Sequence, residues 1–250
     1  MSFGQAIDHA ERMIADGADV IEVGGESTRP GAAPVPEIQE IARVIPVIEE
    51  IVKRWPSARV AIDTVKSEVA SAAIAAGATI VNDVSALRLD TRIADVCAAA
   101  HCTLVLMHSR GDVADMAGYA HADYPNDDVI GAIVRELKPA AERAIAAGVE
   151  GHRIVLDPGL GFSKRPAQSV QALAHLPRLA ELGFEVMVGA SRKRFIGELT
   201  GVEKAAERGA GTVGANVVAL SLGATWFRVH DVRENRHALD AAAAILEACA

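Results

Sequence analysis

The sequence predicts an α/β fold of the TIM type, a (β/α)8 barrel in which seven strands are evident, forming a single domain over residues 1–250. Short apolar runs alternate with amphipathic helical stretches, polar residues follow each run, and a length of 250 residues is typical of such a barrel. No linker or low-complexity stretch divides the chain. Parallel strands joined by helices place their C-terminal ends on one face, where ligands bind.

The predicted strands are short apolar runs bounded by glycine or polar residues. They cover residues 18–23, 59–62, 79–81, 103–107, 153–156, 185–188 and 225–229. Runs of this length between helical stretches are typical of strands buried on both faces.

Helical periodicity predicts eight helices, and several of them end at a glycine, which accepts the left-handed conformation of a helix C-terminus. They cover residues 4–16, 37–54, 66–76, 91–100, 128–147, 168–182, 205–222 and 235–249. A (β/α)8 barrel begins with a strand, whereas this chain begins with a helix. Either the architecture is a different α/β fold, or the first strand and its loop are absent from this sequence; length and alternation favour the second interpretation.

Two loops on the predicted functional face stand out by composition. Residues 24–36 are rich in Gly, Pro, Ser and Thr, and residues 109–127 have little hydrophobic periodicity. Long excursions at this face are commonly substrate lids. For residues 109–127 a simply flexible loop is an equal alternative.

Composition excludes several classes of function. The formal net charge of −8 argues against general binding to nucleic acids or acidic membranes. Nothing resembles a secretory signal or a membrane span, which suggests a cytoplasmic protein. The three cysteines lack the spacing of a metal site, and Cys97 and Cys102 are expected to be small buried hydrophobes.

Polar residues at the strand ends suggest a binding site. Asp63, Asn82 and Asp157 each follow an apolar run. Each alone could simply cap the following helix. Together they offer acceptors and one amide, which suits a flat, nitrogen-rich heterocycle, although binding of a metal by the two aspartates competes with this interpretation.

Cations gather at two later strand ends. Arg192 and Lys193 follow one run, and Arg228 and His230 follow the last. In an acidic chain this clustering suggests a phosphate or diphosphate pocket. Alternation along the chain favours Lys193 pointing inward, with Arg192 and Arg194 in solvent. The sequence contains no nucleophile elbow, P-loop, dinucleotide fingerprint or zinc spacing.

At these residues the chain closely resembles the dihydropteroate synthase family. The matching segments are 24–32 (Gly-Gly-Glu-Ser-Thr-Arg-Pro-Gly-Ala), 62–64 (Ile-Asp-Thr), 82–85 (Asn-Asp-Val-Ser), 107–108 (Met-His), 157–159 (Asp-Pro-Gly), 161–162 (Gly-Phe), 191–193 (Ser-Arg-Lys) and 228–232 (Arg-Val-His-Asp-Val). The resemblance implies a barrel that joins 7,8-dihydropterin-6-ylmethyl diphosphate to 4-aminobenzoate, with Mg2+ as cofactor and a homodimer formed through the later helices.

The resemblance also implies roles for individual residues. The pterin would be held by Asp63, Asn82, Asp157 and Lys193, with Met107 and Phe162 along its pocket. The departing diphosphate would bind Arg228 and His230, which with Lys193 form the expected catalytic set. The aminobenzoate site would be shaped by Thr28, Arg29, Pro30 and Ser191.

The chain departs from the family pattern at three places. The family's opening strand carries an Asn that contributes to magnesium and diphosphate binding, and no such segment is evident here, so the metal ligands are unknown. Glu22 stands where Asp is usual, and Ser163 where Gly is usual. Two alternatives therefore stay open: a pterin-binding barrel of the methyltransferase type, which has no need of a diphosphate site, and an inactive, truncated pterin-binding paralogue.

Overall fold

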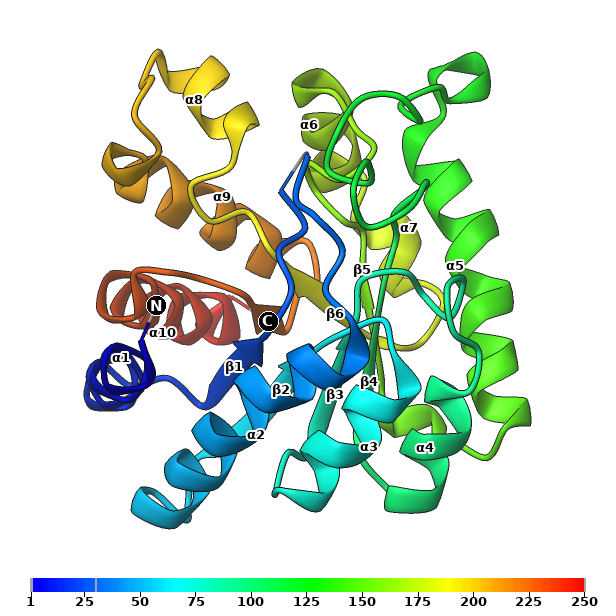
Figure 1. Ribbon diagram of the computed structural model, residues 1–250. Helices are drawn as coiled ribbons and strands as arrows, with labels where there is room; N and C mark the ends of the chain where they lie inside the picture. Colours follow the sequence, from blue (N-terminus) through cyan, green and yellow to red (C-terminus); the bar gives the residue numbers. More distant parts are fainter. Residues whose placement is uncertain (1, 30, 250) are drawn as a thin grey trace.

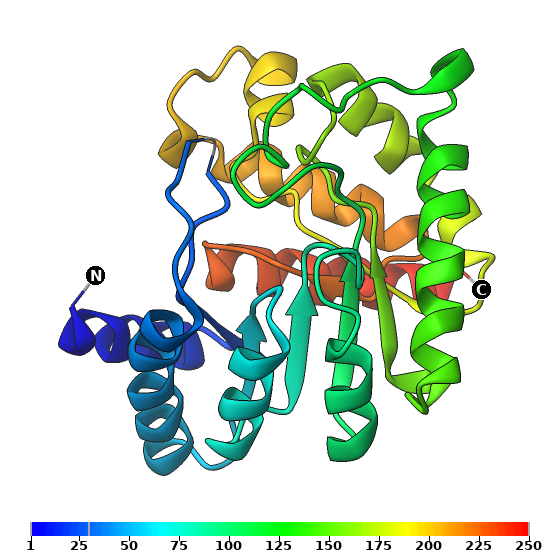
Figure 2. The ribbon, with the colours of Figure 1, turned by 45° about the vertical axis from the view of Figure 1, so that its right-hand side comes forward.

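The computed structural model describes residues 2–29 and 31–249 (Figure 1). Its sheet has seven parallel strands in sequence order: β1 (Val20–Gly24), β2 (Arg59–Asp63), β3 (Ile80–Asp83), β4 (Thr103–Met107), β5 (Ile154–Asp157), β6 (Glu185–Val188) and β7 (Trp226–Phe227). All seven predicted strands are confirmed, and their sequential parallel order is that of a TIM-type barrel. The sheet curls, with helices along its outer side (Figures 1 and 2).

Helices connect the strands as predicted, with two corrections. The helices of the described residues are α1 (Phe3–Ala15), α2 (Glu37–Arg54), α3 (Ser67–Ala75), α4 (Ile93–Ala100), α5 (Val129–Ala146), α6 (Pro166–Ala174), α7 (Pro177–Ala180), α8 (Arg194–Thr200), α9 (Gly209–Ser221) and α10 (Val232–Ala248). The single helix predicted over 168–182 is wrong, because Pro177 cannot donate a backbone hydrogen bond and starts a new helix. Helix α8 was not predicted; it has only seven residues, too few for a clear periodicity.

The inside of the curled sheet is filled by one apolar side chain from each strand. These side chains are Val20, Ala61, Ile80, Val105, Val155, Met187 and Trp226. Neighbouring residues on the same strands, such as Ile21, Ile62 and Leu104, point outward and pack beneath the helices. This alternation follows from the two-residue period of a strand. The inner apolar layer closes the bottom of the functional site.

The two edge strands, β1 and β7, are not paired with each other within the described residues. Ion pairs span this side instead. Arg236 Nη1 lies 2.8 Å from Asp19 Oδ2, and Arg233 Nε donates to Asp16 Oδ1 at 2.8 Å, so that α10 is held beside α1 (Figure 1). These pairs are largely exposed and contribute little stability individually.

Two further findings bear on the sequence expectations. No helix in the described part of the chain is long and apolar enough to cross a membrane. Cys97 and Cys102 are buried free thiols, as expected, whereas Cys249 is exposed.

Candidate active site

A layer of mostly polar residues lies directly above the apolar layer. Each member follows a residue of the apolar layer by two positions, on the same strand or just past its end. Residues two apart on a strand face the same side, so the two layers both face the inside of the sheet. The members are Glu22, Asp63, Asn82, Met107, Asp157, Gly189 and Arg228. The structure thus brings together the strand-end residues predicted for the pterin, and it adds Glu22 and Gly189 to them.

Glu22 contacts two other members of this layer, Asn82 and Arg228. Its Oε2 accepts a hydrogen bond from Asn82 Nδ2 at 2.9 Å, and its Oε1 forms an ion pair with Arg228. Arg228 Nη2 also lies 3.3 Å from Asp63 Oδ2. Sequence reasoning noted Glu22 only as a departure from the family pattern, because a single acidic residue inside an apolar run gives no indication of its partners.

The surroundings of Asp63 disfavour the charged form of its carboxyl group. Burial, reinforced by the nearby Glu22 carboxylate, raises the pKa of Asp63 to about 7, although Arg228 acts in the opposite direction. Near neutral pH this side chain can therefore either accept or donate a proton in a hydrogen bond, which suits the edge of a heterocycle.

In the other half of the layer Asp157 lies near Lys193, whose Nζ donates to the Leu160 carbonyl. A Cβ atom at Gly189 would lie 3.9 Å from both Asp157 Oδ2 and Lys193 Nζ, so the absence of a side chain there keeps the space between them open. Burial raises the pKa of Asp157 despite the nearby Lys193 ammonium. Burial lowers the pKa of Lys193 to about 8. Lys193 Nζ also lies 4.5 Å from the centre of the Phe162 ring, a cation–π contact.

His230 and Ser191 form a second group beside Arg228. His230 Nδ1 lies 2.9 Å from Ser191 Oγ, which also accepts a hydrogen bond from the His230 backbone N–H at 3.1 Å. Burial, followed by the neighbouring Arg192 and Arg228, lowers the pKa of His230. Its imidazole is therefore mostly neutral at pH 7 unless an anion binds next to it.

The other two cations at the β6 end are engaged elsewhere. Arg192 is half-buried and donates to Asp231 Oδ2 through Nε at 3.0 Å. Arg194 is exposed and pairs with Glu198 at 3.2 Å. The expectation that Arg192 lies in solvent is thus only partly right, because Asp231 recruits it into an ion pair.

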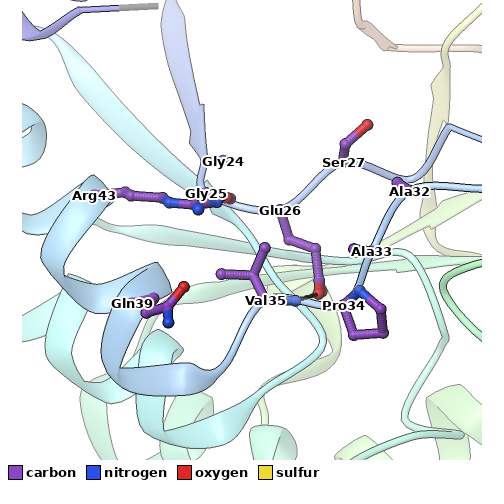
Figure 3. Close-up of a pocket in the computed structure, with 10 residues that line it drawn as sticks. All are labelled: Gly24, Gly25, Glu26, Ser27, Ala32, Ala33, Pro34, Val35, Gln39 and Arg43. Atoms are coloured by element: carbon purple, nitrogen blue, oxygen red, sulfur yellow. Dashed lines mark hydrogen bonds between the residues drawn. The ribbon is translucent and has the colours of Figure 1, made fainter.

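The 24–36 loop is anchored by a buried charge cluster. Lys66 Nζ donates to Glu26 Oε2 at 3.0 Å, to Glu40 Oε2 at 2.6 Å and to the Val35 carbonyl at 2.8 Å. Figure 3 shows Glu26 reaching back to the Val35 backbone N–H and Arg43 lying against Gly25. These residues line a cavity of about 560 Å3 between the loop and α2.

The predicted aminobenzoate residues are not all gathered by these contacts. Thr28 is half-buried and Arg29 is exposed. Within residues 2–29 and 31–249, neither side chain forms a hydrogen bond with Ser191. Pro30, the fourth member of the predicted set, lies outside the described residues.

The 109–127 loop packs against the site through an apolar cluster. Met116 is fully buried against Val65, Val84 and Met107, beside the half-buried Phe162. The loop also meets the first one, since the Gly31 N–H donates to the Ala114 carbonyl at 3.3 Å. Figure 2 shows both loops rising on the same side of the sheet, above the strand tips.

Ser163 fastens this second loop. Its Oγ accepts from the Arg110 N–H at 2.9 Å and lies 2.9 Å and 3.1 Å from the carbonyls of Arg110 and Met116. The Tyr124 hydroxyl donates to the Ser163 carbonyl at 2.9 Å. A glycine would lack the hydroxyl, so this departure from the family pattern adds a link between the loop and the 157–163 segment.

A buried network beneath the site was not predicted. Lys164 is fully buried, and its Nζ lies 2.8 Å from His108 Nδ1, 3.2 Å from the Gly159 carbonyl and 3.1 Å from the Phe162 carbonyl. His108 Nε2 lies 3.1 Å from Glu136 Oε2. Burial lowers the pKa of Lys164 and lowers that of His108 to about 4. The three acceptors around Lys164 Nζ nevertheless match the three donors of an ammonium group. Because His108 Nδ1 accepts from Lys164, the proton of the neutral imidazole lies on Nε2, which donates to Glu136.

No metal cage accompanies these residues. Among residues 2–29 and 31–249, no group of three His, Cys, Asp or Glu side chains could hold a metal ion. The two carboxylates beside Arg228, Glu22 and Asp63, already contact that cation.

Comparison with known proteins shows the family of this chain. The family model described as "Pterin binding enzyme" matches residues 1–230. Dihydropteroate synthase from Neisseria meningitidis serogroup C is 40% identical over 238 residues, which cover 94% of this chain and 82% of that protein. The same enzyme from Mycobacterium leprae is 40% identical over 249 residues, covering 97% of this chain and 86% of that protein.

Solved structures agree. Dihydropteroate synthase from Xanthomonas albilineans with 4-aminobenzoic acid superposes with a TM-score of 0.90 at 44% sequence identity, covering 98% of this chain and 85% of that one. The same enzyme in complex with 7,8-dihydropteroate gives a TM-score of 0.87 at 41% identity, covering 98% and 88% of the two chains. These matches confirm the TIM-type fold and favour the synthases over a methyltransferase barrel.

The curled parallel sheet, the polar layer above its apolar interior and near full-length similarity all agree with one assignment. The chain belongs to the pterin-binding enzyme family and, within it, to the dihydropteroate synthases, the transferases of folate biosynthesis.

Proposed function

We propose that the protein joins 7,8-dihydropterin-6-ylmethyl diphosphate to 4-aminobenzoate and releases 7,8-dihydropteroate and diphosphate. The observation that carries this proposal is the inward-facing polar layer, in which hydrogen-bonding groups for a heterocycle adjoin the cation of Arg228. The related Xanthomonas albilineans structures hold 4-aminobenzoic acid in one case and 7,8-dihydropteroate in the other, which supports the choice of substrates.

The pterin would lie on the polar layer. Asp63, Asn82 and Asp157 supply acceptors and an amide, and Lys193 supplies a donor. Met107 and Phe162 would cover the flat faces of the ring. Burial of Asp157 supports this arrangement, because a partly dry site strengthens hydrogen bonds to a ligand.

The diphosphate would bind between Arg228 and His230. Arg228 has five N–H donors, of which Nε and Nη2 point toward Glu22 and Asp63. The neutral state of His230 in the free protein leaves room for a gain of charge, since an adjacent diphosphate would raise its pKa. We assign 4-aminobenzoate to the neighbourhood of Thr28, Arg29, Pro30 and Ser191.

The chemical step would be a substitution at the pterin methylene carbon. The amine nitrogen of 4-aminobenzoate donates its electron pair to that carbon, the carbon–oxygen bond breaks, and its electron pair leaves with the diphosphate oxygen. The amine then loses a proton. Negative charge grows on the leaving group, so Arg228 and His230 would stabilise the transition state more than the bound substrate. No protein nucleophile is needed.

Four sequence expectations stay predictions: Mg2+, a homodimer, a single domain and a cytoplasmic setting. Within residues 2–29 and 31–249, no set of three His, Cys, Asp or Glu side chains forms a magnesium site on its own. Mg2+ is commonly held by one or two carboxylates together with substrate phosphates, so the bound diphosphate could supply ligands that the free protein lacks.

Substitution Arg228→Ala tests the proposed function. Removal of one preorganised charge at a leaving group typically lowers kcat by about 100- to 1000-fold, and we expect a loss of this size in dihydropteroate formation measured with magnesium present. Because Arg228 is 46% exposed, the variant is expected to fold, which circular dichroism would verify.

Arg194→Ala is the matched control, since Arg194 is exposed; it pairs with Glu198 in the same helix and its guanidinium lies 5.7 Å from the centre of the Tyr119 ring. Near-wild-type kinetics of Arg228→Ala would refute the assignment. A wild-type protein that binds pterin but forms no dihydropteroate would instead be the inactive, pterin-binding relative considered from the sequence.

A further inference from the structure

The side-chain amide of Asn82 is only half satisfied. The residue is 2% exposed, and its Nδ2 donates to Glu22 Oε2 at 2.9 Å. Its Oδ1 is buried and has no hydrogen-bond partner in the described structure. A buried acceptor without a partner is costly, so this oxygen is poised for a donor that arrives from outside the protein.

The chemistry of Glu22 determines which end of the amide is left free. An ionised carboxylate can only accept hydrogen bonds, so the amide nitrogen of Asn82 must face it. The Arg228 guanidinium, which can only donate hydrogen bonds, contacts the other Glu22 oxygen. The reversed amide would set two acceptor oxygens against each other.

We propose that Glu22 is a positioning residue that fixes the Asn82 amide in one orientation, so that its carbonyl oxygen receives an N–H group of the pterin. The proposal rests on the proposed function for its ligand. A dihydropterin carries several ring and amino N–H donors, whereas an amide turned the other way would present N–H groups to them. Glu22 therefore acts through Asn82 and determines which hydrogen-bond pattern that amide presents to the pterin.

Glu22→Gln removes this control while changing the shape of the side chain very little. The carbonyl oxygen of the introduced glutamine can still accept from Arg228, which leaves its amide NH2 group facing Asn82. The Asn82 amide then turns, accepts that bond through Oδ1 and presents its own NH2 group to the ligand. We expect 6-hydroxymethyl-7,8-dihydropterin, which has no diphosphate to contact Arg228, to bind about tenfold more weakly, the effect of losing one good hydrogen bond.

A polarity exchange separates this role from a general loss of structure. Asn82→Asp alone places two carboxylates side by side and should weaken binding. In the double variant Glu22→Gln/Asn82→Asp, the introduced glutamine donates to one oxygen of the introduced aspartate. The second oxygen of that aspartate again faces the pterin, and the total charge is unchanged. We expect the double variant to bind the pterin about tenfold more tightly than the weaker single variant, a non-additive recovery.

Isothermal titration calorimetry with this pterin gives the affinities, and thermal melts verify folding. Glu185→Gln is the matched control, because Glu185 is exposed at the opposite end of the sheet, where its Oε2 accepts from Trp226 Nε1 at 2.8 Å. Glu22→Asp keeps an acceptor-only group and should bind within about threefold of the wild type.

Wild-type affinity in Glu22→Gln, a tenfold loss in Glu22→Asp, or purely additive losses in the double variant would each overturn the proposal. Failure of the proposed function appears differently, as a wild-type protein that forms no dihydropteroate. If that protein still binds the pterin, the exchange experiment tests Glu22 unchanged.

Discussion

Asp63→Asn should change how the stability of the ligand-free protein depends on pH. The Asp63 carboxyl is 21% exposed and faces Glu22 and Arg228, and more distant carboxylates at Glu40 and Asp83 act in the same direction as Glu22. Burial and these negative charges raise its pKa from 3.8 to about 7. Asparagine has a similar shape, can still accept from Arg228 and cannot ionise.

The sign follows from proton binding. Between pH 4 and 7 the unfolded chain has lost the Asp63 proton while the folded protein keeps it, so stability falls as pH rises through this window. The slope is about 1.36 kcal/mol per pH unit for one group, so the rise from pH 5 to the folded pKa near 7 costs about 3 kcal/mol. Above pH 7 the contribution is constant.

Urea denaturation of the two proteins at several pH values measures this effect. We expect the free energy of unfolding of Asp63→Asn, relative to the wild type, to increase by about 2–3 kcal/mol between pH 5 and 8. Buried Asp83 and Asp157, whose pKa values are also raised, add the same slope to both proteins and cancel in the difference. Asp8→Asn, at an exposed carboxylate, serves as control. Parallel curves for wild type and Asp63→Asn would contradict the reasoning.

Two further predictions concern the segment after β5. Ser163→Ala removes the buried hydroxyl that binds the Arg110 N–H and the Met116 carbonyl. It should lower the free energy of unfolding by about 2 kcal/mol and speed hydrogen exchange at the Arg110 amide. Unchanged exchange would show that the hydroxyl does not hold the loop in place. Gly159 has a positive φ of 65°, and Gly159→Ala would place a Cβ atom against the His108 carbonyl oxygen. The substitution should destabilise the protein by about 3 kcal/mol in urea denaturation and abolish pterin binding in calorimetry. Wild-type stability would mean that the loop shifts freely.

The sequence by itself determined the strands and most of the strand-end layer. An apolar run followed by Asp63, Asn82 or Asp157 is a local pattern, and the two-residue period of a strand then places each polar residue on the inner face. Parallel order brings the ends of all strands to one level, so the grouping of these residues follows from local signals alone.

Only the tertiary structure decided the partners of Glu22 and Lys164. A carboxylate in an apolar run and a lysine in a loop carry no local sign of burial. Their positions depend on Arg228 and Asn82 in one case, and on His108 and the carbonyls of Gly159 and Phe162 in the other. Desolvating a charge is favourable only where such partners converge, and that convergence arises from segments far apart in the chain.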